Sequence, residues 1–163
     1  MSENKNFKRS FPLLELDPRP DYLCIEKITE ILNKESTLTW IFYGTYEELE
    51  FLLKNKYLNP NANLTNGMKP LHLLSASKDE KAVELFLNYG ADVNSKDNLG
   101  ETPIFSLLQV LHIPTLKILI EHGADLNAKS SINQPFWIHA HKIGNIEFNH
   151  KIHEYSKNNK LYQ

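Results

Sequence analysis

The stretch "NYGADVNSKDNLGETPIF", residues 88–105, decides the fold that the sequence predicts. Its glycines, its Asp-x-Asn step and its Thr-Pro pair favour turns and helix ends, and none of them is a nucleophile. A second stretch, "EHGADLNAKSSINQPFW" at 121–137, repeats this pattern. The repeated residues are Gly90, Ala91, Asp92 and Asn94, which return as Gly123, Ala124, Asp125 and Asn127. A fixed period of this length is typical of stacked supersecondary units.

Two helices are predicted between successive turns. Pro70 and Pro103 are separated by the same period, and each stands where the first residue of a helix needs no backbone donor. Apolar residues recur with helical periodicity in "DEKAVELFLNY" (79–89) and "PTLKILIEH" (114–122). Gly90 and Gly123 then follow the last apolar turn, where a residue without a Cβ ends a helix at little cost. Each unit therefore reads as helix, tight turn, helix and extended turn.

Capping residues support these helix starts. Thr45 and Glu48 have the spacing of a capping box, and so do Ser77 and Glu80. Thr102 is suited to cap the helix that begins at Pro103.

These units resemble the ankyrin repeat family. The resemblance is carried by "KPLHLLSA" (69–76) with "VELFLNYGADVNSKD" (83–97), and by "GETPIFSLL" (100–108) with "LKILIEHGADLNAK" (116–129). It implies an all-α solenoid of stacked helix-turn-helix units joined by β-hairpin-like turns. We expect an ankyrin repeat domain at 35–163, with units at about 35–64, 65–97, 98–130 and 131–163, the first and last being degenerate. Residues 1–34 are expected to form a flexible segment and then an N-terminal capping helix.

The Thr-Pro-Leu-His step of the family is split here. One unit has His72 without a threonine at position 69, and the next has Thr102 with Phe105 in place of the histidine. The usual Thr-His bond cannot form within either unit, so we expect His72 to have a structural role with another partner.

Composition narrows the function. The chain of 163 residues has a net charge of −2 and no basic cluster, which disfavours nucleic acid as a partner. Cys24 is the only cysteine, so no intrachain disulfide can form. No signal-like or membrane-length apolar run occurs. We expect a cytoplasmic protein without a membrane partner, a monomer on its own, although delivery as a secreted effector stays open.

No motif indicates catalysis. Nucleotide-binding loops, nucleophile elbows and paired-cysteine metal spacings do not occur, so we expect no enzyme, no cofactor and no catalytic residue. The last unit does contain His139, His141, His150 and His153. On a helix His150 and His153 share a face, as zinc would require, whereas His139 and His141 diverge. A metal-dependent enzyme is therefore only a remote alternative, and no metal site is expected.

The resemblance implies that a partner protein binds the concave face formed by the hairpin tips and the first helices. Position by position, this face comprises Asn66, Met68, Ser77, Lys96, Asn98, Leu99, Glu101, Gln109, Val110, Lys129, Ser131, Ile132, Gln134 and Lys142. Met68, Leu99 and Ile132 are the informative members, because large apolar side chains at hairpin tips have no core to enter. Lateral packing of these tips on their neighbours is the structural alternative.

The predicted function is a protein-protein interaction module that binds and inhibits or sequesters a partner. A bacterial immunity or antitoxin protein and a host-directed effector are its more specific versions. Self-association through an open end exposing Trp137, Ile138 and Phe148 is a further alternative.

Overall fold

The computed structural model describes residues 37–158. The flexible segment and capping helix expected within 1–34, and Cys24 with them, lie outside the described residues. The chain divides into two compact units, Met1–Leu58 and Asn59–Gln163.

The first unit contains α2 (Thr37–Tyr43) and α3 (Tyr46–Lys54). The predicted capping box at the start of α3 is confirmed. Thr45 Oγ1 accepts a hydrogen bond from the Glu48 amide at 3.2 Å, and Glu48 Oε2 accepts one from the Thr45 amide at 2.9 Å. Leu49, Leu52 and Leu53 recur along one face of α3 and are buried.

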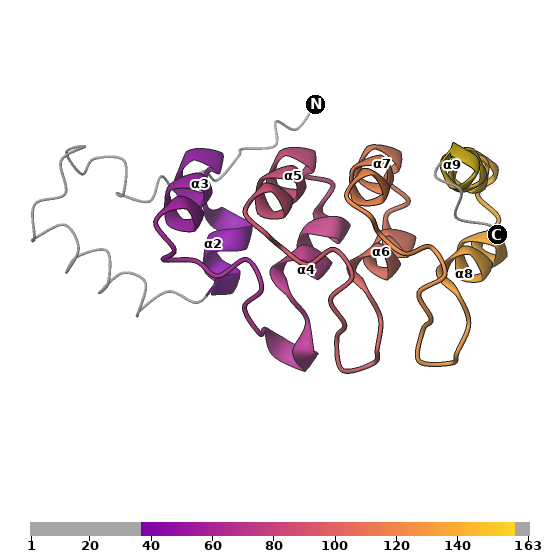
Figure 1. Ribbon diagram of the computed structural model, residues 1–163, viewed down its shortest axis with the longest axis horizontal. Helices are drawn as coiled ribbons and strands as arrows, with labels where there is room; N and C mark the ends of the chain where they lie inside the picture. Colours follow the sequence, from indigo (N-terminus) through magenta and orange to yellow (C-terminus); the bar gives the residue numbers. More distant parts are fainter. Residues whose placement is uncertain (1–36, 159–163) are drawn as a thin grey trace, which may run out of the picture. The chain divides into compact units, whose positions relative to one another are not determined.

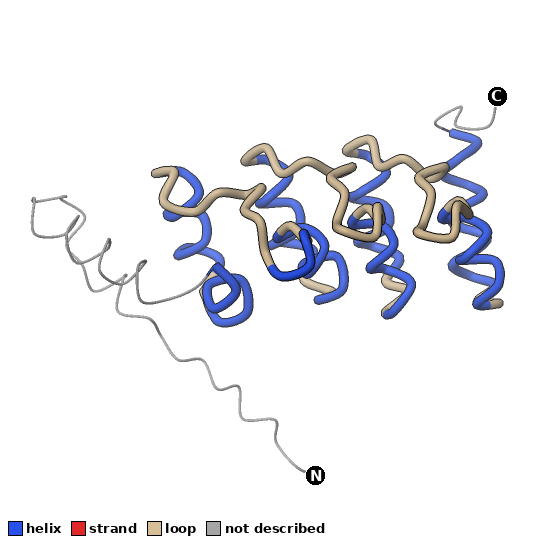
Figure 2. Tube along the Cα trace, turned by 90° about the horizontal axis from the view of Figure 1, so that it is seen from below, coloured by secondary structure: helices blue, strands red, loops and turns tan. Residues whose placement is uncertain are grey.

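The second unit stacks three helix pairs. They are α4 (Pro70–Ser77) with α5 (Glu80–Asn88), α6 (Pro103–Ser106) and η3 (Leu107–Gln109) with α7 (Ile113–Glu121), and α8 (Phe136–Ile143) with α9 (Ile146–Asn158). Within this unit, α4, α6 and α8 form one row and α5, α7 and α9 a second row (Figure 1). The loops that lead from one pair to the next project to the same side (Figure 2). This arrangement is the all-α solenoid that the repeat period predicts.

Proline and glycine set the helix ends as the sequence predicts. Pro70 and Pro103 are the first residues of α4 and α6. Gly90 and Gly123 follow the ends of α5 and α7, each with φ of 87°. A residue with a Cβ is strained in that left-handed region, so glycine is the residue that lets each helix stop there.

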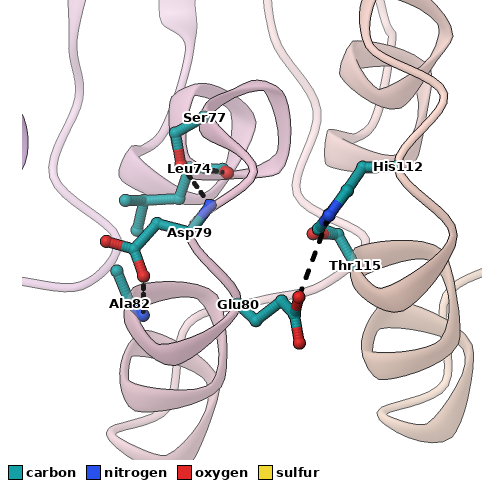
Figure 3. A network of polar contacts seen from close by, with 7 residues as sticks. All are labelled: Leu74, Ser77, Asp79, Glu80, Ala82, His112 and Thr115. Atoms are coloured by element: carbon teal, nitrogen blue, oxygen red, sulfur yellow. Dashed lines mark hydrogen bonds and ion pairs between the residues drawn. The ribbon is translucent and has the colours of Figure 1, made fainter. Parts of the chain in front are cut away.

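One predicted cap is wrong. Ser77 and Glu80 form no capping box, because Asp79 lies at the N-cap of α5 and accepts a hydrogen bond from the Ala82 amide at 3.1 Å (Figure 3). Ser77 Oγ instead donates to the Leu74 carbonyl at 2.8 Å. Asp79 is the better cap because a carboxylate also interacts favourably with the positive end of the helix dipole.

The core of the second unit lies between successive helix pairs. Its fully buried side chains include Leu71, Leu74, Phe86, Ile104, Leu107, Leu116, Leu119, Phe136 and Phe148. Full burial of one such side chain stabilises a fold by roughly 1.5–3 kcal/mol. Phe148, expected to be exposed at an open end, is 0% exposed, and Ile138 is half-buried, so of the three expected residues only Trp137 is exposed.

The three extended turns close in the same way, at equivalent positions of successive repeats. The amides of Leu64, Asp97 and Ser130 donate to the carbonyls of Met68, Glu101 and Gln134 at 2.8, 3.0 and 2.9 Å. The described residues contain no strand, and only the third turn has a β-bridge, between Lys129 and Pro135. The turns are therefore hairpin-like loops rather than a sheet.

Asparagines connect the turns to one another. Asn61 Nδ2 donates to the Gly90 carbonyl at 2.8 Å, and its Oδ1 accepts from the Asp92 amide at 2.8 Å. Asn94 makes the same two bonds one repeat later, to Gly123 and Asp125, both at 2.9 Å. Asparagine suits this position because one amide group is both a donor and an acceptor.

Candidate protein-binding surface

Two adjacent hairpin tips contact each other directly in the second unit. The Asn98 amide donates to the Asn66 carbonyl at 3.0 Å. Asn66 has φ of 60° and Gly67 has φ of 73°, and a Cβ added at Gly67 would lie only 3.0 Å from the Asn98 nitrogen. The missing Cβ of Gly67 thus allows this close approach.

A groove lies beside this contact, between the tips and the first helices. Its volume is about 490 Å³, within the range of roughly 300–1,000 Å³ that is common for binding pockets. The lining residues come from η2 (Thr65–Gly67), α4, α6, η3 and the loop before α6. They are Asn66, Met68, His72, Asp97, Asn98, Leu99, Glu101, Thr102, Phe105, Ser106 and Gln109.

Part of the predicted surface lines this groove. The predicted residues that do so are Asn66, Met68, Asn98, Leu99, Glu101 and Gln109. Leu99 is 61% exposed, whereas Met68 is half-buried. The hairpin tip therefore holds an apolar side chain in solvent at the edge of a concave site.

The other predicted residues do not line the groove. They are Ser77, Lys96, Val110, Lys129, Ser131, Ile132, Gln134 and Lys142. Ser77 ends α4 and is bonded to its own helix, at the junction with α5. Ile132, at the tip of the next turn, is 63% exposed, and Lys142 Nζ donates to Gln134 Oε1 at 2.6 Å. Position in the repeat thus identifies two exposed apolar tips, of which one borders the groove.

His72 forms part of the groove wall and ties two turns together. Its Nδ1 accepts from the Lys69 amide at 3.0 Å, so the ring proton is on Nε2, which donates to the Glu101 carbonyl at 3.0 Å. The ring is 2% exposed and neutral in this bonding arrangement. The expectation that His72 bonds to a partner other than a threonine agrees with these contacts.

Thr102 and Phe105 are groove residues that the sequence does not identify as such. Thr102 occupies the N-cap position of α6, as predicted, but its side chain makes no capping bond. Its buried Oγ1 has no hydrogen-bond partner among the described residues. Phe105, which is the equivalent of His72 in the next repeat, packs edge-on against Phe136 at 5.6 Å between ring centroids. The only feature of the sequence that could have pointed to these two groove residues is the broken Thr-Pro-Leu-His step.

The backbone of Glu101 is held on both sides. Its amide donates to Asp97 Oδ1 at 2.9 Å, and its carbonyl accepts from the Asp97 amide and from His72 Nε2, both at 3.0 Å. Asp97 Oδ1 also accepts from the Leu99 amide at 2.8 Å. Asp97 therefore shapes the tip, and the Glu101 carboxylate projects from a fixed backbone.

The charges of the groove are of one sign. Asp97 and Glu101 are its ionisable acids, and within the described part of the chain no lysine or arginine lines it or pairs with them. The groove is therefore acidic. On α9, outside the groove, a hydrogen bond from Lys151 to Glu154 lowers the pKa of the glutamate and raises that of the lysine.

The C-terminal histidines do not converge. His139 Nε2 lies 2.9 Å from Ser130 Oγ, and its ring packs against Phe105. His141 and His153 share a smaller cavity of about 300 Å³ with Trp137, and His150, which helical spacing pairs with His153, does not line it. Across residues 37–158, no three His, Cys, Asp or Glu side chains are grouped as a metal site would need.

Among the described helices, α2 to α9 inclusive, none is both long enough and apolar enough to cross a membrane.

Sequence comparison supports the repeat assignment. The profile described as ankyrin repeats (3 copies) matches residues 38–130, more than half of the chain. An ankyrin repeat protein of Rickettsia felis is 32% identical over 92 residues, which are 50% of this chain and 40% of that protein. Tyrosine-protein kinase HTK16 of Hydra vulgaris is 33% identical over 84 residues (52% of this chain, 11% of the kinase). Delta-latroinsectotoxin-Lt1a of Latrodectus tredecimguttatus is 42% identical over 48 residues (29% and 4%).

The chain thus spans less than half of the length of each of these relatives. The fixed repeat period, the stacked helix pairs and the matching profile lead to one conclusion. The chain belongs to the ankyrin repeat family.

Proposed function

We propose that this chain binds another protein through its hairpin tips and first helices and acts by occupying that partner. The observation that carries the proposal is the pair of apolar tips, Leu99 and Ile132, which are 61% and 63% exposed at equivalent positions of successive repeats. Exposed large apolar side chains that recur along one face are typical of interfaces and unfavourable in a surface that stays in water.

The arrangement also favours binding without rearrangement. Hydrogen bonds close each turn and connect Asn98 to Asn66, so the surface is largely formed before a partner arrives. A preformed surface loses little conformational entropy on association, and more of the contact energy then appears as affinity.

The more specific roles follow from this mode of action. A rigid surface that occupies a partner blocks whatever that partner's covered face does, so we propose inhibition or sequestration. An immunity or antitoxin protein and a host-directed effector are the versions of this role that we favour. The cytoplasm is the proposed location.

Leu99→Glu and Ile132→Glu test the proposal. Each places a charge at an exposed tip, so we expect partner capture from the native cell to be lost while helix content and melting temperature stay nearly unchanged. Lys54→Glu, at an exposed position on α3, is the matched control and should retain capture. Full capture by both tip variants would contradict the proposal. Loss of the fold would show instead that these side chains are core residues.

A further inference from the structure

The groove offers an apolar contact and an acidic group side by side. Leu99 and Met68 form the apolar edge near the tips, and Phe105, only 6% exposed, lies deeper in the wall. Apolar side chains line ligand pockets because their contact with a ligand removes water from both surfaces. An occupant therefore needs a large apolar side chain at this edge.

The acidic groups of the groove determine which residue of the occupant can lie next to that apolar side chain. The groove holds Asp97 and Glu101 and, within residues 37–158, no lysine or arginine. Asp97 Oδ1 already accepts bonds from the amides of Leu99 and Glu101, so the Glu101 carboxylate is the freer of the two acids. His72 adds no positive charge, because its Nδ1 accepts a bond from the Lys69 amide. An acidic occupant would be repelled and a basic one attracted.

Amide and hydroxyl groups complete the lining. Asn66, Asn98, Gln109 and Ser106 can donate to and accept from the backbone of an extended chain. From these features we infer that the groove accepts an extended segment of the partner protein, in which a large apolar residue stands next to a lysine or arginine. The apolar side chain contacts Leu99, Met68 and Phe105, and the cationic group pairs with Glu101. This inference rests on the proposed function and names the chemistry of its partner.

The test uses the full chain and a random peptide library displayed on phage. We expect enriched sequences in which an apolar residue adjoins a lysine or arginine. The dissociation constant of a selected synthetic peptide should rise about tenfold for Glu101→Gln, as for a charge-assisted hydrogen bond of about 1.4 kcal/mol. Leu99→Ala should weaken the same peptide by a similar factor. Glu84→Gln, an exposed glutamate on α5, is the matched control and should have no effect.

A double-mutant cycle isolates the pairing. A peptide whose basic residue is replaced by glutamine should bind the unaltered protein about tenfold more weakly than the original peptide does. The Glu101→Gln protein should bind the two peptides with equal affinity. Additive effects, enrichment of acidic or purely apolar peptides, or no enrichment would overturn the inference. If the inference fails in this way but Leu99→Glu still loses partner capture from the native cell, the proposed function stands. If both tip variants, Leu99→Glu and Ile132→Glu, still capture the partner, the proposed function is overturned.

Discussion

Asn94 holds the turn of the following repeat through Asp125: its Oδ1 accepts the Asp125 amide at 2.9 Å while its Nδ2 reaches the Gly123 carbonyl. Two repeats are thereby joined by one side chain that lies outside the apolar core. Stability in repeat proteins depends on such nearest-neighbour terms as well as on each repeat by itself.

Asn94→Ala should therefore destabilise the fold. Two hydrogen bonds are lost, each contributing about 0.5–1.5 kcal/mol, so we expect the free energy of unfolding in urea to fall by about 1–3 kcal/mol. Asn88→Ala, at the exposed last position of α5, is the control and should change it by less than about 0.5 kcal/mol. Equal effects of the two substitutions would contradict the joining role of Asn94.

His72→Phe should destabilise the fold, although phenylalanine occupies the equivalent position of the next repeat, 105. The substitution removes the acceptor of the Lys69 amide and one of the two donors to the Glu101 carbonyl, which keeps the Asp97 amide. Both bonds are lost in a site where the ring is 2% exposed. We expect a loss of about 1–3 kcal/mol, measured by thermal or urea unfolding. His122→Phe, on an exposed histidine at the end of α7, should be nearly neutral, and a neutral His72→Phe would refute the bonding role.

Thr102→Val should be neutral or stabilising. Within residues 37–158 the buried Thr102 Oγ1 has no hydrogen-bond partner, and valine has the same shape without a polar group to bury. We expect the melting temperature to stay or rise. Ser75→Ala is the contrast, because Ser75 Oγ donates to the Leu71 carbonyl at 2.7 Å, and its loss should cost about 1 kcal/mol. A destabilised Thr102→Val protein would mean that the hydroxyl has a partner in solution.

Gly67→Ala and Gly100→Ala separate backbone strain from contact between tips. Both glycines have positive φ, 73° and 78°, so each substitution carries a strain of roughly 1–2 kcal/mol. A Cβ at Gly100 meets nothing within 4 Å, whereas one at Gly67 meets Asn98. Gly67→Ala should therefore be the more destabilising, and it should also weaken binding of any peptide selected on the groove. Equal losses of unfolding free energy would argue against a close contact between the tips.

The helix pairs can be predicted from the sequence because their signals are local. Gly90, Gly123 and the helix-starting Pro70 and Pro103 mark helix ends by their own backbone preferences, and the fixed period places them in register. The N-cap of α5 is predicted wrongly because Ser77 and Asp79 are both residue types that cap helices and lie close together. Asp79 is the cap because α5 begins at Glu80.

The groove can be predicted only in part. Leu99 is identifiable because an apolar residue at a hairpin tip is visible in the register. Phe105 stands out as a departure from the motif, whereas Thr102 keeps it. The place of both residues in a groove wall depends on the neighbouring tip, which no local pattern describes. That His141 and His153 line one cavity likewise depends on how α8 packs against α9.

The fixed peptide of Glu101 has a consequence for the speed of binding. Its amide and carbonyl are already satisfied by Asp97 and His72, so no loop has to close before the carboxylate meets a partner. Association should then be limited by encounter and orientation, at about 10⁵–10⁷ M⁻¹s⁻¹, and should slow as salt screens the acidic groove. Differences between related partners would appear mainly in how long each one stays bound.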